Sequence, residues 1–454
     1  MDVFNQVNHV IAIIGAGPAG LFAARQLVEQ GNYVVIINRD IKPGGLAEYG
    51  IYPTKYKMKD GLRKQFRQII EHPLIAYYGN VVVGDNGDLS LHDLETLGFQ
   101  AILVTAGAQG TKWLGLPGEN TTRGVYHAKD LVYHYNKLPP FSQKQFEIGR
   151  KVAIIGVGNV MSDISRYLIT NLKVDEVIPI ARRGPAEVKF DKKEIEHIIS
   201  CLDIHALDEE IERVKPIMQA VDQDPQAARD YILSSMEKAE PLHSNSKLKF
   251  TFLASPTRII GDEHGNLLGL EIEDNTLIRD EEGETKAKPL GVKRILDVDT
   301  VIFCIGDRVD DHLGLPIQGT QFVKNPFPQY SIDGISYEVY NPLAGKAMEG
   351  IFVAGWSREA SVGLVGVARK DGERCAKAIL QYLESVNRVA NPARIIQAFE
   401  QALKQTGKPI IRQPDLWKLQ SVEQAEMMRL GLEDFKFGTN EEMLKAIEFN
   451  LVFG

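Results

Sequence analysis

Glycines near the N-terminus are spaced as in turns that bind dinucleotide phosphates. The run Gly15-Ala16-Gly17-Pro18-Ala19-Gly20 follows the β-branched stretch 10–14 and precedes an apolar helical pattern. In such a turn the first glycine permits the tight bend, the second lets backbone approach a pyrophosphate, and the third lets the helix pack on the strand. The amides at the helix N-terminus can then hold phosphates. The strand–turn–helix context makes the motif much more specific than its glycines alone, which would also suit a plain tight turn.

A second unit of the same kind begins at residue 151. The apolar stretch 151–155 precedes the turn Gly156-Val157-Gly158-Asn159-Val160 and a helical pattern. Where the next strand ends, Arg182 and Arg183 replace the acid that usually binds an NAD ribose. Guanidinium groups bind the 2′-phosphate of NADP bidentately, although an arginine pair can also simply end an exposed strand. The repeat therefore predicts two nucleotides, FAD in the first unit and NADPH in the second.

One residue of the first unit departs from the usual pattern. Asn38 closes the second strand about twenty residues past the glycines, where such folds normally carry an acid that binds a ribose hydroxyl. An asparagine can accept the same hydrogen bond through its carbonyl, although more weakly than a carboxylate. We expect Asn38 to take the ribose position with a weakened contact.

Composition limits the class of protein. A chain of 454 residues is long enough for two or three domains, and 44% hydrophobic and 25% charged residues are ordinary globular values. The net charge of −8 argues against a general nucleic-acid binder. The cysteines, Cys201, Cys304 and Cys375, lie far apart and form no C-x-x-C motif, so neither a dithiol centre nor a metal site is indicated.

The sequence also gives no membrane or export signal. Residues 1–9 contain neither the basic nor the apolar region of a signal peptide, and no apolar run approaches the length of a membrane span. We expect a cytoplasmic protein that does not bind membranes.

The pattern of the chain predicts the elements that position these turns. Strands are expected at 10–14, 33–37, 80–83, 99–104, 151–155, 174–180, 301–306 and 350–354, with helices at 21–28, 62–70, 162–171, 368–383 and from 395 to 403. Residues 248–253 and 267–273 read as an antiparallel pair joined through the turn 262–266, and 203–240 as acidic helices. The basic run 55–67 predicts either a solvated helical face or a docking surface for an anionic partner or cofactor phosphate.

These motifs together resemble the adrenodoxin reductase-like group of NADPH:ferredoxin reductases, which is similar also to the small subunit of glutamate synthase. The resemblance implies an α/β fold of the glutathione-reductase type, with two Rossmann-like dinucleotide-binding domains. It implies an FAD domain formed by 1–108 and 330–454, including a C-terminal helical tail, and interrupted by an NADP domain at 109–329. The matching stretches are 15–20, 43–59, 78–84, 116–119, 156–163, 182–185 and 355–365, together with the spacing from Arg183 to Glu194.

The resemblance also implies particular cofactor-binding residues. For FAD they are Gly15, Gly17, Ala19, Gly20, Asn38, Leu46, Val82, Trp356, Gly363, Leu364 and Val365. For NADPH they are Val157, Gly158, Asn159 and Val160 at the pyrophosphate, Arg182 and Arg183 at the 2′-phosphate, and Glu194 on the adenosine side.

Several positions differ from the family pattern. The family usually has Glu at the position of Asn38, Asp-His at Thr54-Lys55, and Arg-Gly-Pro-Thr at Glu359–Val362. His197 replaces a common Glu, and the acidic region 203–240 stands where relatives present arginines to an acidic ferredoxin. These differences affect the expected partner more than the expected cofactors.

The hard chemistry is expected to belong to the cofactors, with Lys55, Asp163 and His197 as candidate catalytic side chains. We hypothesise that Lys55 lies near the isoalloxazine and favours an anionic flavin by charge attraction. The alternative is that Lys55 faces solvent with Lys57 and Lys59.

The function that the resemblance implies is transfer of a hydride from NADPH to FAD, followed by single-electron transfer to a ferredoxin-like iron–sulfur protein or a flavodoxin. Two alternatives stay open. The protein could reduce a small molecule or a dedicated partner subunit, or it could be a non-catalytic subunit that keeps FAD as a structural element.

Overall fold

The computed structural model describes residues 3–241 and 244–452, which divide into two compact units. The first unit contains the described residues up to Lys112, Tyr133–Gln143, and those from Gly306 onward. The second contains Trp113–Val132 and the described part of Lys144–Ile305, so it is inserted into the sequence of the first. These boundaries differ from the expected 108/109 and 329/330, because residues 109–112, 133–143 and 306–329 belong to the first unit.

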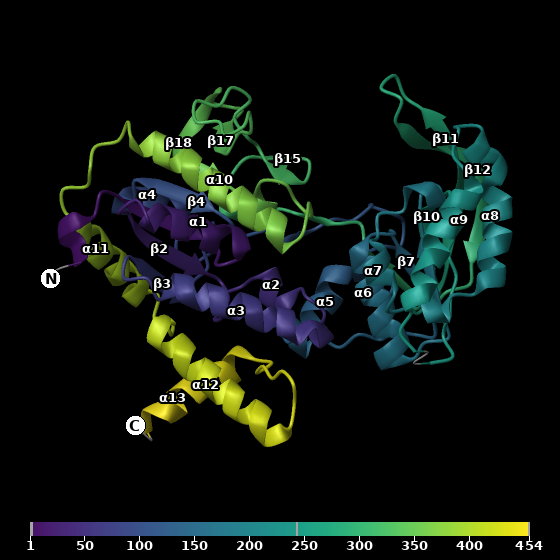
Figure 1. Ribbon diagram of the computed structural model, residues 1–454, viewed down its shortest axis with the longest axis horizontal. Coiled ribbons are helices and arrows are strands. Elements are labelled where there is room, and N and C mark those ends of the chain that lie inside the picture. The colour runs from purple at the N-terminus through teal and green to yellow at the C-terminus, as the bar shows by residue number, and fades with distance from the viewer. Residues whose placement is uncertain (1–2, 242–243, 453–454) are drawn as a thin grey trace. The chain divides into compact units, whose positions relative to one another are not determined.

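The first unit is built on a six-stranded sheet in the order β17-β18-β4-β1-β2-β3 (Figure 1). Neighbouring strands are parallel except for β17, which is antiparallel to β18. The strands are β1 (Val10–Ile14), β2 (Tyr33–Asn38), β3 (Ile75–Gly79), β4 (Ala101–Val104), β17 (Glu338–Asn341) and β18 (Lys346–Val353).

Both faces of this sheet are buried, which explains the unbroken β-branched run of β1. Ile11 and Ile13 belong to the core on one side, and Val10, Ala12 and Ile14 to the core on the other. Such two-sided burial is typical of parallel sheets. The helices of this unit are α1 (Pro18–Val28), α2 (Leu46–Tyr49), α3 (Tyr56–Ile70), α4 (Leu91–Leu97), α10 (Val365–Leu383), α11 (Pro392–Gln405), α12 (Gln413–Leu430) and α13 (Asn440–Val452).

The second unit contains a five-stranded parallel sheet in the order β6-β13-β7-β8-β9. Its strands are β6 (Val125–His127), β7 (Lys151–Ile155), β8 (Glu176–Ile180), β9 (Lys247–Leu248) and β13 (Thr300–Phe303). Its helices are α6 (Asn159–Tyr167), α7 (Lys192–Ile195), α8 (Ile204–Gln219) and α9 (Pro225–Leu233), whereas α5 (Ala128–Tyr135) crosses between the units in sequence.

Most expected elements are confirmed within a few residues, but three differ. The strand expected at 80–83 lies instead at 75–79, because Asn80 adopts a positive φ of 64° that ends the extended chain. The helix expected at 162–171 begins at Asn159 and ends in a π-type turn at Leu168–Leu172. The first of these shifts places Val82 outside the sheet.

The antiparallel pair has a different first strand from the one expected. The turn 262–266 joins β10 (Ala254–Gly261) to β11 (Leu267–Arg279), and β11 pairs in turn with β12 (Thr285–Leu296). The start of the expected strand, β9, is parallel to β8 instead. Among the described residues, no helix has the length and apolarity needed to cross a membrane.

Candidate functional site

The first glycine turn joins β1 to α1 and has two crowded positions and one open position. Gly15 has φ +103°, and a Cβ there would lie 2.5 Å from the carbonyl oxygen of Thr105. At Gly20 a Cβ would lie 2.3 Å from the carbonyl oxygen of Gly15. At Gly17 it would meet nothing within 4 Å, and α1 begins there without a side-chain cap. The turn therefore leaves free helix amides facing open space, as a pyrophosphate site requires.

Thr105 supports the first glycine turn, and the sequence analysis did not single it out. Its hydroxyl donates to the carbonyl oxygens of Gly15, at 2.8 Å, and of Ile14, at 3.1 Å. Thr105 directly follows β4, the strand next to β1. A hydroxyl side chain at the end of a buried strand is the sequence feature that could have identified it. The side chain stabilises the carbonyl that Gly20 approaches.

Ala19 lies within the turn but its contacts are those of a packing residue. It is buried, and Cβ atoms at Gly355 and Gly372 would lie 2.8 Å from its Cβ and 2.1 Å from its carbonyl oxygen. These approaches let α10 pack directly on α1, and Figure 1 shows the two helices side by side.

Asn38 closes β2 as expected, and its side chain also forms hydrogen bonds inside the protein. Its Oδ1 accepts from the Ala16 amide at 3.0 Å, and its Nδ2 donates to the carbonyl oxygens of Asp40 and Lys42 at 2.8 and 3.0 Å. Nδ2 also contacts the Tyr77 hydroxyl at 3.2 Å. Asn38 thus stabilises the backbone of the glycine turn through its bond to the Ala16 amide. A carboxylate could not make the donated bonds, which gives the change from Glu a structural reason.

The turn at Pro43–Leu46 lies beside the first glycine turn. The Gly44 amide donates to the carbonyl oxygen of Ala16 at 2.8 Å, and Gly45 has φ +50°. A Cβ at Gly45 would lie 3.3 Å from the Cα of Gly17. The half-buried Leu46 follows directly, so it is placed near the open face, whereas Val82 lies outside the sheet and its amide donates to Asp88.

The loop before α10 brings the other expected FAD residues together. Trp356 Nε1 donates to the carbonyl oxygens of Val362 at 3.0 Å and Gly363 at 3.3 Å. Leu364 is 66% exposed at the helix start, and α10 has no side-chain cap. Val365 is half-buried. An exposed apolar surface beside uncapped amides fits a flat, partly polar ring system.

Asp371 fixes this loop and was also missed. Its Oδ2 accepts from the Gly355 amide at 2.7 Å, and its Oδ1 accepts from the Tyr337 hydroxyl at 3.1 Å. The buried Arg358 forms an ion pair with the same carboxylate at 2.7 Å. The changed Glu359–Val362 segment is therefore fixed at its start. Within it, Ser361 has φ 60° and its hydroxyl accepts from the Asp307 amide at 2.8 Å.

The second glycine turn repeats the geometry of the first within the second unit. Gly156 has φ +116°, and a Cβ there would lie 2.4 Å from the carbonyl oxygen of Cys304. At Gly158 a Cβ would meet nothing within 4 Å, and α6 begins there without a side-chain cap. Val157 is half-buried and Val160 is 43% exposed. The turn again leaves an open face at a helix N-terminus, which fits a second pyrophosphate.

Asn159 contributes to this turn through a pair of hydrogen bonds with Asp191. Its Nδ2 donates to Asp191 Oδ2 at 2.9 Å, and its Oδ1 accepts from the Asp191 amide at 2.8 Å. The Asn159 side chain is therefore committed, and only its backbone amide is left for a phosphate.

Arg182 and Arg183 follow β8 but have different surroundings. Arg182 is exposed. Arg183 is half-buried, its Nη1 lying 3.3 Å from Glu187 Oε1 and 3.5 Å from the carbonyl oxygen of Thr285. Glu194, in α7, is half-buried. The exposed Arg182 is the better placed of the two arginines for an incoming phosphate.

The three candidate catalytic side chains do not come together in one unit. Lys55 is half-buried in a 3-10 turn of the first unit, and Asp163 lies half-buried on α6 of the second. His197 Nδ1 lies 2.7 Å from Glu240, which also pairs with the buried Arg166. His197 is thus part of a local ion-pair cluster.

Cys201 and Cys375 lack the properties of reactive thiols. Burial raises the pKa of the Cys201 thiol and raises that of Cys375 further. No group of metal ligands occurs among the described residues.

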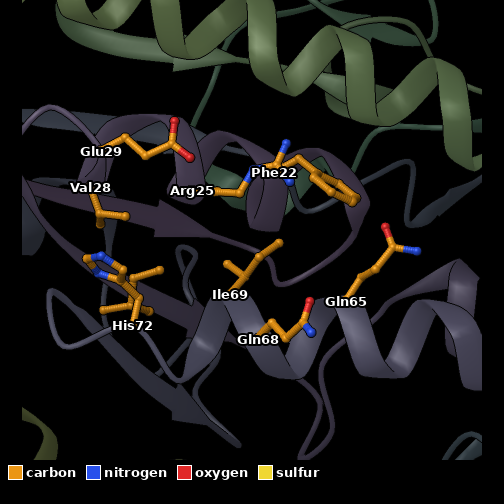
Figure 2. A pocket seen from close by; sticks show the side chains of 9 residues that line it. Phe22, Arg25, Val28, Glu29, Gln65, Gln68, Ile69 and His72 are labelled. Carbon is orange, nitrogen blue, oxygen red and sulfur yellow. The ribbon is translucent and has the colours of Figure 1, made fainter.

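A groove of about 260 Å³ lies between α1 and α3 (Figure 2). Phe22, Val28 and Ile69 form apolar parts of its lining, with Arg25 and His72 among the polar residues. Arg25 is already paired with Glu373 at 2.8 Å. None of the expected cofactor residues lines this groove, so it is separate from the candidate site.

The fold and the two open turns define a protein with two dinucleotide-binding units. The model of the pyridine nucleotide-disulphide oxidoreductase family matches residues 9–337, and the chain belongs to that family. It is an oxidoreductase, which confirms the class of enzyme that the family resemblance implied.

Similar proteins agree with the resemblance noted in the sequence. NADPH-ferredoxin reductase FprA of Mycobacterium leprae is 27% identical over 413 residues, covering 84% of this chain and 85% of that protein. The probable mitochondrial NADPH:adrenodoxin oxidoreductase of Dictyostelium discoideum is 29% identical over 432 residues, covering 84% and 80%. The solved structure of Mycobacterium tuberculosis FprA in complex with NADPH has a TM-score of 0.79 at 24% identity, over 97% of this chain and 99% of that one, so the fold is shared.

Proposed function

We propose that this protein oxidises NADPH and passes the electrons, through bound FAD, to a ferredoxin-like iron–sulfur protein or a flavodoxin. The observation that supports this most is the pair of open glycine turns, one in each unit. The second unit carries the adjacent arginines Arg182 and Arg183 after its second strand, whereas the single Arg39 at that place in the first unit is paired with Asp40. When bound, FAD supplies the chemistry, because it accepts a hydride and releases electrons one at a time.

In the first unit, the chain's own residues hold the shape of an FAD site. Gly17 and the first amides of α1 would contact the pyrophosphate, and Leu46, Trp356 and the loop 363–365 would contact the flavin end. Asn38, the residue expected at the FAD ribose, also fixes the backbone of the glycine turn. Thr105 and Asp371 would act only through the backbone that they fix.

In the second unit, the residues favour a phosphorylated nicotinamide nucleotide. Gly158 and the α6 amides would hold the pyrophosphate, and Arg182 with Arg183 would bind the 2′-phosphate. A free guanidinium at the end of β8 attracts a doubly charged phosphate, whereas an NAD ribose gains little from it.

The proposed acceptor rests on relatives named as ferredoxin and adrenodoxin reductases. The region 203–240, which contains α8 and α9, has ten Asp or Glu residues against four Lys or Arg, which indicates that an acidic partner would not dock there. Glu209, Glu212 and Asp230 expose 70%, 72% and 62% of their side chains. This acidic surface favours the second candidate function, reduction of a small molecule or of a dedicated partner subunit.

A cytoplasmic location is part of the proposal. Cys201, Cys304 and Cys375 form no disulfide in the described structure, as is usual in reducing compartments. The adrenodoxin oxidoreductase relatives are named as mitochondrial, so fractionation of the source cells is the test.

An anaerobic stopped-flow experiment distinguishes these functions. The FAD-loaded protein is mixed with NADPH, then with ferredoxin or flavodoxin at increasing ionic strength. We expect flavin bleaching, followed by acceptor reduction that slows with salt, because charge-steered association is screened. Bleaching without transfer to either acceptor would favour a small-molecule or dedicated acceptor, and absence of bleaching would indicate a non-catalytic flavin.

A further inference from the structure

Lys189 lies beside the second glycine turn, although it is far from that turn in the sequence. Its backbone amide donates to the carbonyl oxygen of Val157 at 3.1 Å, and Lys189 forms an isolated parallel bridge with Gly158. Residues joined in this way have backbones about 5 Å apart. Lys189 is therefore the immediate neighbour of the open glycine.

A second contact fixes the segment in this position. The reciprocal hydrogen bonds between Asn159 and Asp191, at 2.8 and 2.9 Å, join the first residue of α6 to the residue two positions after Lys189. Together with the Val157 bond, they hold the segment 189–191 against the turn at both ends. The position of the Lys189 backbone is thus set by the same elements that form the phosphate-binding turn.

The side chain of Lys189 is available for a ligand. Phe190 is buried among Tyr231 and Phe250, whereas the neighbouring Lys189 side chain lies outside that core. Lys189 is exposed, and its ammonium forms no ion pair or hydrogen bond with any described residue. Its flexible four-carbon stem can place the charge over the turn, where a Cβ at Gly158 would meet nothing.

We propose that the Lys189 ammonium binds the pyrophosphate of the nicotinamide dinucleotide held by the second turn. The inference rests on the proposed function, in which that turn takes NADPH. Lys189 is tied to Val157 and Gly158, the pyrophosphate end of the site, whereas Arg182 and Arg183 follow β8 at the 2′-phosphate end. A lysine acts as a point charge on phosphate, so it needs no bidentate geometry.

The proposed contact predicts how the affinities for NADP⁺ and NAD⁺ change when Lys189 is removed. NADP⁺ and NAD⁺ share the pyrophosphate and differ in the 2′-phosphate. Loss of Lys189 must therefore weaken both nucleotides by the same factor, and loss of Arg182 must weaken NADP⁺ much more than NAD⁺.

The test is equilibrium titration of the FAD-loaded protein with NADP⁺ and with NAD⁺. For Lys189→Ala we expect about tenfold weaker binding of each, with an unchanged ratio of the two dissociation constants. Lys189→Arg should retain most of the affinity. Lys193→Ala, which removes an exposed lysine of the nearby α7, is the matched control and should bind like the wild type.

Two results would overturn the inference. Unchanged affinities in Lys189→Ala would show that the lysine does not contact the nucleotide. A selective loss of NADP⁺ binding would place Lys189 at the 2′-phosphate instead. A wild-type protein that binds neither nucleotide would instead refute the proposed function, so the two failures are distinguishable.

Discussion

Gly17 and Gly20 belong to one turn, but a side chain would meet different surroundings at each. At Gly17 an added Cβ enters open space, whereas at Gly20 it would lie 2.3 Å from the Gly15 carbonyl oxygen. Substitution therefore separates the binding role of the turn from its packing role.

We expect Gly17→Ala to fold normally and to lose FAD, because the new methyl occupies the space that the pyrophosphate needs; affinity should fall about tenfold or more. Gly20→Ala should instead lower the free energy of unfolding by about 1–3 kcal/mol, since backbone must shift to accept the methyl. Flavin content after purification and urea unfolding measure the two effects. Equal losses of stability in both variants would contradict the assigned roles.

Arg182 gives a second prediction at the scale of single residues. Arg182→Ala removes an exposed guanidinium that would bind only the 2′-phosphate, so the preference for NADPH over NADH should fall by about 10–100-fold in kcat/KM. The exposed Arg258 of β10 pairs with Glu271, and Arg258→Ala is the control. A preference that survives in Arg182→Ala would show that other residues select the phosphate.

Part of the positive charge of helix α3 is buried or paired with acidic side chains. The sequence predicts a cationic helical face at 55–67, but Lys59 is buried and Arg63 pairs with Glu48 and Asp434, at 2.7 and 2.9 Å. The segment 433–438 between α12 and α13 thus neutralises part of the face. A docking surface for an anionic partner could use only the exposed remainder of α3.

Glu48 is the centre of this buried cluster. Burial alone would raise the pKa of its carboxyl, but the charges of Lys436, Lys42 and Arg63 hold the pKa well below its ordinary value. Lys436 Nζ lies 3.2 Å from Glu48 Oε1 and donates to the Glu48 carbonyl oxygen at 2.9 Å. The pairing attaches the C-terminal segment to α2.

Lys436→Met should therefore destabilise the protein, because it leaves the buried Glu48 carboxylate with fewer partners. We expect a loss of about 1–3 kcal/mol in the free energy of unfolding. The exposed Lys445 of α13 provides the control, Lys445→Met. If both variants unfold at the same urea concentration as the wild type, the cluster contributes no stability.

Lys59 has a predictable effect on pH dependence. Burial, helped by the nearby charge of Lys436, lowers the pKa of Lys59 from 10.5 to about 7, while Glu48 and Asp434 oppose the change and Arg63 adds to it. Between these two values the unfolded chain binds more protons than the folded one. The free energy of unfolding therefore rises with pH in this range, by up to about 1.4 kcal/mol per pH unit for this group.

The variant Lys59→Met should lose this contribution. We expect its stability to rise less steeply than that of the wild type between about pH 7 and pH 9, as followed by urea unfolding at several pH values. Loss of the 2.7 Å bond from Lys59 to Asn136 lowers stability at every pH, so the slope is the informative quantity. Parallel curves would mean that Lys59 keeps an ordinary pKa.

The elements around the glycine turns could be predicted because their signals are local. The runs 10–14 and 151–155 are continuous and apolar, and each is followed by glycines at the spacing of a dinucleotide-binding turn. The strand at 75–79 was missed because Asn80 leaves the extended region, which sequence pattern alone does not reveal. The long-range partners of Asn38, Thr105 and Asp371 could not be predicted, since they depend on contacts between distant strands and loops.

At the scale of the whole molecule, the insertion of one dinucleotide-binding unit into another was predicted, but its boundaries were not. Residues 306–329 belong to the first unit because β14 (Asp307–Arg308) pairs with β5 (Gly110–Thr111) there. These short strands have no hydrophobic periodicity to mark them. The family resemblance predicted that one unit is inserted into the other. The residue boundaries of the units depend on tertiary contacts, which the sequence does not reveal.

We propose that the first turn holds FAD and that the second selects a phosphorylated nicotinamide nucleotide. Anaerobic mixing of the purified FAD-loaded protein with equal concentrations of NADPH or NADH tests it most directly, with flavin absorbance as the readout. We expect NADPH to bleach the flavin at least about tenfold faster than NADH at subsaturating concentration, because only NADPH gains the arginine contacts. Equal rates with the two nucleotides, or a protein that retains no flavin, would contradict the account.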